Sequence, residues 1–99
     1  MENFDYKKRI SENFMRLNAI VKMFNKFEFY DLKCDVSSVQ LQGTYKPEIV
    51  SFAMKHKFTI SASDFGYIKL QRVSKCKKVV NNYFECENYS IVYVITLTD

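Results

Sequence analysis

The sequence has only two glycines and one proline in 99 residues. This scarcity excludes a collagen-like or low-complexity chain. The two glycines, Gly43 and Gly66, stand alone, so the chain has no glycine-rich loop of the kind that cradles phosphates. No apolar run approaches the roughly 20 residues that a helix needs to span a bilayer. We therefore expect no membrane partner.

Residues suited to catalysis or metal binding are also scarce. His56 is the only histidine, and no serine stands in a G-x-S-x-G motif. The spacing of His56 and the three cysteines matches no common zinc pattern. We expect a protein that is not an enzyme, with no catalytic residue, no cofactor and no metal site.

The three cysteines are Cys34, Cys76 and Cys86. An odd number without C-x-x-C spacing favours reduced thiols over a disulfide framework. Residues 1–9 lead into a charged amphipathic segment and not into an apolar run, which argues against a secretory signal. We therefore expect a cytoplasmic protein. The many Lys, Asn, Tyr and Phe residues resemble the usage of AT-rich genomes, and a small phage or virus gene is our hypothesis for its origin.

The remaining composition is that of one folded domain, residues 1–99. Apolar residues make up 47% of the chain and charged residues 26%, and the formal net charge is +4. Aromatic residues reach 16%, with seven Tyr and nine Phe. Large rings bury much area per residue, so they supply a core to a short chain.

The spacing of apolar residues predicts a long N-terminal helix over about 4–26. Its apolar stripe advances by steps of three and four residues, through Ile10, Phe14, Leu17, Val21 and Phe24. A helix with one apolar side needs a broad apolar surface to lie on. The rest of the chain supplies one, because it reads as strands.

Alternating apolar and polar residues predict strands over about 28–36, 39–45, 48–62, 66–80 and 83–98. The longest alternation runs from Val50 to Ala62. A helix beginning at Pro47 is the alternative there, because proline is favourable at the first helical position. The length of the alternation favours a strand.

Turn residues then predict the pairing of the strands. Gly66 suits the left-handed position of a hairpin loop, which sets Ile60 opposite Leu70. Asn81–Asn82 suits a second turn, which sets Ile68 opposite Ile95. The predicted fold is α+β, with the long N-terminal helix packed on a four- to five-stranded antiparallel meander sheet.

The second hairpin is predicted to be longer than the helix can cover. Its tip has apolar residues among charged ones, an arrangement found in protein contact sites. The candidate protein-contact residues are Val79, Val80, Tyr83 and Phe84. We expect a small binding module, a regulator or inhibitor, that contacts another protein through this tip and an exposed strand edge. A homodimer is also open.

The alternative function is nucleic-acid binding by a basic face of the sheet. Residues 55–78 carry seven basic side chains and a single acidic one, Asp64. The predicted register would gather a row of lysines with one aromatic ring on the outward face, as single-strand binders do. The residues of this candidate site are Lys55, Lys57, Lys69, Lys75, Lys77 and Tyr67.

Overall fold

A computed structural model describes residues 6–79 and 86–99 of the chain. The α+β class is confirmed, with a helix packed on a five-stranded sheet. The chain has a second helix that the sequence prediction assigned to a strand. In chain order the elements are α1 (Tyr6–Met23), β1 (Phe29–Cys34), β2 (Ser38–Thr44), α2 (Pro47–Lys55), β3 (Thr59–Asp64), β4 (Tyr67–Val79) and β5 (Cys86–Thr98).

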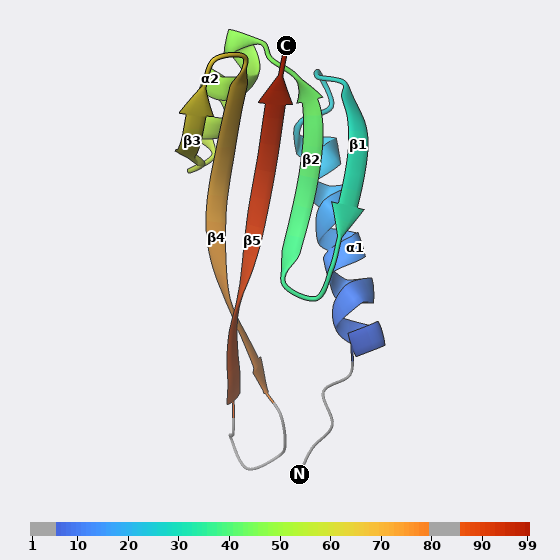
Figure 1. Ribbon diagram of the computed structural model, residues 1–99. Helices are drawn as coiled ribbons and strands as arrows, with labels where there is room; N and C mark the ends of the chain where they lie inside the picture. The colour runs from blue at the N-terminus through green and yellow to red at the C-terminus, as the bar shows by residue number, and fades with distance from the viewer. Residues whose placement is uncertain (1–5, 80–85) are drawn as a thin grey trace.

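The sheet is mixed, so the prediction of an antiparallel meander is wrong. The strand order is β1-β2-β5-β4-β3, and β2 pairs in parallel with β5. The other three pairs are antiparallel. The segment with α2 carries the chain from β2 to the far edge of the sheet (Figure 1). β5 can therefore lie between β2 and β4.

The predicted strand over 48–62 is wrong for its first half, which forms α2. The helix begins at Pro47. Proline lacks a backbone N–H, but the first N–H of a helix has no hydrogen-bond acceptor within the helix, so nothing is lost there. Ile49 and Ala53 lie one turn apart and are both buried, whereas Met54, part of the predicted apolar alternation, is exposed. Burial at helical spacing thus overrides the alternation. The strand begins only at Thr59, after Lys57 adopts a positive φ of 70°.

The first predicted hairpin is confirmed in its essentials. Gly66 has a φ of +73°, and Ile60 pairs with Leu70. The second hairpin forms with a different register, because Ile68 pairs with Leu97 and not with Ile95. A shift of two residues leaves every side chain on its predicted face.

Both helices lie on one face of the sheet, and the core lies between them and the strands (Figure 1). Phe24, directly after α1, is fully buried, and its ring packs edge-on against Phe52 of α2 at 4.9 Å between centroids. Leu41, Leu70 and Ile95 project from the strands into the same core. The opposite face of the sheet carries no helix among the described residues. None of the described helices has the length and apolar character needed to cross a bilayer.

Candidate protein-interaction surface

α1 does not bury the whole apolar stripe that the sequence predicts. Leu17 is buried, but Ile10 is 42% exposed and Phe14 is 56% exposed. Arg9 and Asn13 are buried in their place, with Asn13 fully buried. The N-terminal half of α1 thus turns polar side chains toward the rest of the protein and apolar ones toward solvent.

A polar cluster explains this rotation of the helix. The Arg9 guanidinium lies 3.5 Å from the centroid of the Tyr89 ring, and Arg16 donates to the Tyr89 hydroxyl at 3.1 Å. Asn13 donates through Nδ2 to the Asp35 carbonyl at 2.7 Å and accepts from Arg16 Nη1 at 2.7 Å. Hydrogen bonds to charged groups and a stacked guanidinium are worth more than the partial burial of two apolar side chains.

The displaced apolar side chains lie on the flank of α1 that faces the outer edge of the sheet. At 3.6 residues per turn, the exposed Ile10 and Phe14 fall on one flank of the helix, together with Val21, which is half-buried against the core. Arg16 lies about a third of a turn away and points toward β5. α1 lies over β1 and β2 (Figure 1), so the flank opposite Arg16 is the one on the side of β1.

Leu32 of β1 continues this apolar flank. It pairs with the fully buried Leu41, so its side chain is on the helix face of the sheet. Leu32 is nevertheless 43% exposed, because β1 is the outermost strand and none of the described strands pairs with its outer side. We use the name edge surface for the outer backbone groups of β1 together with the side chains of Ile10, Phe14, Val21 and Leu32.

The alternation of hydrogen bonds shows which backbone groups of β1 face outward. The Asp35 N–H donates to the Ser38 carbonyl at 3.0 Å, so the pair 35/38 is hydrogen-bonded across the hairpin. Such pairs alternate along an antiparallel ladder, so Lys33 and Asp31 bond to β2. The N–H and C=O groups of Leu32 therefore face solvent and are ready to pair with another strand.

Asp35 fixes the turn that ends β1. Its carboxylate accepts from the backbone N–H groups of Ser37 at 2.8 Å and Ser38 at 2.7 Å. The hydrogen bond from Ser37 contributes most, and together these bonds hold the pKa of the Asp35 carboxyl below its usual range. Burial together with the charge of Asp35 raises the pKa of the neighbouring Cys34 thiol. The turn is thus pinned by a carboxylate, and the end of the edge strand is held in place.

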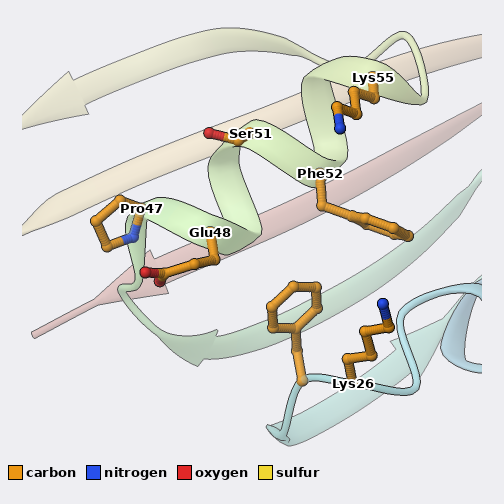
Figure 2. A pocket seen from close by; sticks show the side chains of 7 residues that line it. Lys26, Pro47, Glu48, Ser51, Phe52 and Lys55 are labelled. Carbon is orange, nitrogen blue, oxygen red and sulfur yellow. The ribbon is translucent and has the colours of Figure 1, made fainter.

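A shallow recess lies at the other end of the molecule, between α2 and the segment after α1. Figure 2 shows the side chain of Phe52 extending from α2 into this recess above Lys26. The Phe52 and Phe27 rings are 5.6 Å apart and belong to the rim of the core. The His56 ring lies against that of Phe52 in a tilted arrangement, at 4.6 Å between centroids. No described group of three or more His, Cys, Asp or Glu side chains could hold a metal ion here or elsewhere.

The lysines of the predicted nucleic-acid site do not form one row. Lys69 and Lys75 stand at alternate positions of β4 with Tyr67, on the sheet face away from the helices. Lys55 belongs to α2 and Lys57 follows it, on the helix side of the sheet. The predicted row is therefore wrong for Lys55 and Lys57, because neither residue is in a strand. The side chain of Lys77 lies outside the described residues.

The predicted hairpin contact is described only in part. β4 and β5 remain paired as far as Val79 and Cys86, whereas β2 pairs with β5 only from Val92 onward. The hairpin therefore runs past the end of β2 (Figure 1), and its six residues 86–91 span about 20 Å at about 3.3 Å per residue. Val80, Tyr83, Phe84 and the side chain of Val79 lie outside the described residues.

Comparisons with protein-family models, curated proteins and solved structures found no match to this chain.

Proposed function

We propose that this protein is a non-enzymatic binding module that recognises another polypeptide along the edge surface. The observation that carries the proposal is an outermost strand with outward backbone groups, placed beside exposed apolar side chains of α1. Exposed strand edges bind extended peptides by adding a strand to the sheet. Apolar side chains beside such an edge add burial of apolar surface to the backbone hydrogen bonds, which alone do not distinguish one peptide from another.

The two kinds of contact have separate roles at this surface. The outward N–H and C=O groups of Leu32 would fix the direction and register of the added strand. Phe14 and Leu32 would cover alternate side chains of that strand on the helix face. Asp31 and Lys33, both exposed on the opposite face, would select among partners by charge.

The projecting β4–β5 hairpin supplies a second, separate contact in this proposal. Its length past β2 supports a role in reaching a partner. The contact residues at its tip remain a prediction from the sequence. Nucleic-acid binding also remains a prediction from the sequence, and the structure does not favour it, because Lys55 in α2 and Lys57 after it do not join the lysines of β4.

The proposal is tested with a library of displayed peptides selected on the purified protein. Selected peptides are then assayed against Phe14→Asp and against Met15→Asp. Met15 is the matched control, because it is the next residue of α1, is 70% exposed and points away from the flank of Phe14.

We expect the Phe14→Asp variant to lose peptide binding at least tenfold and the Met15→Asp variant to retain it. Hydrogen exchange with bound peptide would show new protection of the Leu32 amide. The selection uses protein dilute enough to be monomeric, so that the edge surface is uncovered. Binders that treat the two variants alike, or a selection on the monomer that yields no binder, would overturn the proposed function.

A further inference from the structure

We propose that the polypeptide bound at the edge surface is a second copy of this chain, paired through β1 in antiparallel fashion about a two-fold axis at Leu32. The inference rests on the proposed function and names its partner. It follows from three features of the described residues: the outward hydrogen-bonding groups of β1, the order of its charges and the position of α1.

The first feature is the set of hydrogen-bonding groups. Because the N–H and C=O groups of Leu32 face outward, Leu32 can exchange two hydrogen bonds with the partner subunit's Leu32. This places the two-fold axis between two identical residues, as a self-complementary interface requires. The two sheets then join with their helices on the same side.

The second feature is the order of the charges. A two-fold axis at Leu32 places Asp31 directly opposite the partner subunit's Lys33, and Lys33 opposite the partner subunit's Asp31. The neighbouring registers that also match outward groups have the axis at Asp31 or at Lys33. Each of them sets two like charges directly opposite, which is unfavourable. The charges therefore favour one register over its neighbours.

The third feature is the position of α1. Since α1 lies over β1 and β2, and strands are about 4.8 Å apart, its axis would be about 5 Å from the two-fold axis. The axes of the two α1 helices would then be about 10 Å apart, near the distance of packed helices. The exposed Phe14 lies on the flank that would meet the partner helix, beside Val21, which already packs partly on the core. The pairing thus buries the apolar side chains that the polar cluster turns outward.

The consequence is a continuous sheet of ten strands in which β1 is no longer an edge. A long exposed edge with apolar neighbours is a hazard for uncontrolled association, and symmetric closure removes it. Only β3 then remains at the edges of the joined sheet. β3 carries three hydroxyl side chains and Asp64 beside a single large apolar residue, Ile60, and all six of its residues are exposed.

The test uses charge reversal, because Asp31 and Lys33 are exposed and each faces a glutamine across β2. Sedimentation equilibrium is compared for the full chain, for Asp31→Lys, and for the double variant Asp31→Lys/Lys33→Asp. Glu48→Lys is the matched control, because it makes the same change of charge at an exposed site on α2.

We expect a dimer that Asp31→Lys weakens about tenfold, since two attractions become two repulsions. The double variant restores the wild-type dissociation constant, and Glu48→Lys leaves it unchanged. In hydrogen exchange, protection of the Leu32 amide rises with protein concentration in parallel with dimer formation.

Two results would overturn the inference. One is a protein that sediments as a monomer at every concentration measured. The other is a dimer that Asp31→Lys and Glu48→Lys affect equally, which would place the contact elsewhere. Neither result bears on the peptide selection at Phe14. A monomer whose selected peptides still discriminate between Phe14→Asp and Met15→Asp would keep the edge surface and exclude only the second copy as its occupant.

Discussion

Replacing a buried polar residue of α1 is expected to cost more stability than replacing its large apolar neighbour. In Asn13→Ala the carbonyl of Asp35 and the guanidinium of Arg16 each lose a hydrogen bond of 2.7 Å. Asn13 is fully buried, and its bond to Arg16 involves a charged group. Losses of this kind amount to about 2–4 kcal/mol.

For Phe14→Ala the expected loss is small. The side chain is more than half exposed, and full burial of a phenylalanine contributes about 1.5–3 kcal/mol, so its burial here contributes roughly 1 kcal/mol. The higher helix propensity of alanine offsets up to about 0.7 kcal/mol of that. The stability of Phe14→Ala is therefore expected to lie within about 1 kcal/mol of wild type.

Urea denaturation followed by circular dichroism measures both variants against wild type. With a slope of about 1–2 kcal/mol per molar, Asn13→Ala moves the midpoint down by roughly 2 M and Phe14→Ala by less than 1 M. Leu17→Ala calibrates the scale, since a buried leucine of the same helix costs about 2–5 kcal/mol. If Phe14→Ala proved more damaging than Asn13→Ala, α1 would have the orientation that its sequence stripe predicts. The edge surface would then lose its apolar contribution from α1.

Three further predictions concern the turns and the core. Asp35→Ala is expected to lower the free energy of unfolding by about 0.5–1 kcal/mol at pH 7. Because folding lowers the pKa of this carboxyl, its stabilisation is present above about pH 4 and is lost as the pH falls through the folded pKa. A difference in stability between variant and wild type that does not change with pH would refute this role. Gly66→Ala is expected to lower the melting temperature by about 4–8 °C, since a side chain at φ +73° costs about 1 kcal/mol, and an unchanged melting curve would contradict this. Phe24→Ala removes a fully buried ring and is expected to cost about 3–5 kcal/mol, whereas Phe65→Ala, at a fully exposed position, leaves the urea midpoint unchanged; equal effects would contradict the burial of Phe24.

Local patterns predict the elements of this fold better than their arrangement. The position of α1, the turn at Gly66 and the pairing of Ile60 with Leu70 follow from spacing and turn residues. The parallel pair of β2 and β5 has no such local signal. Its strands are more than forty residues apart, and only the path of α2 across the sheet brings them together.

α2 itself shows why the segment after Pro47 misled the sequence reading. Its nine residues fit both an alternation of two and a helical spacing of three and four, so periodicity alone could not decide. The decision comes from the core. Ile49 and Ala53 reach the same buried cluster as Phe24 only from a helix, and Phe58 adds to that cluster after the helix has ended.

The edge surface was only partly predictable, for a related reason. An exposed strand edge was expected, but the rotation of α1 was not, because it depends on Tyr89, which is 73 residues away from Arg16 in the sequence. The polar residues responsible, Arg9, Asn13 and Arg16, stand four and three residues apart. That spacing is itself helical. The spacing could have indicated a buried polar face of α1 if the contact of that face with Tyr89 had been known.

The rotation of α1 is also the strongest reason to assign a role to its apolar flank. In a chain selected only for stability, apolar pattern and burial agree along each helix, and disagreement is expected where function intervenes. The C-terminal half of α1 follows this agreement, with Leu17 and Ile20 buried and Phe24 buried directly after the helix. The N-terminal half departs from it and turns Phe14 outward beside an outermost strand. Two departures at one place, an uncovered ring and an unpaired edge, are both resolved if a further strand pairs with β1 and covers the ring.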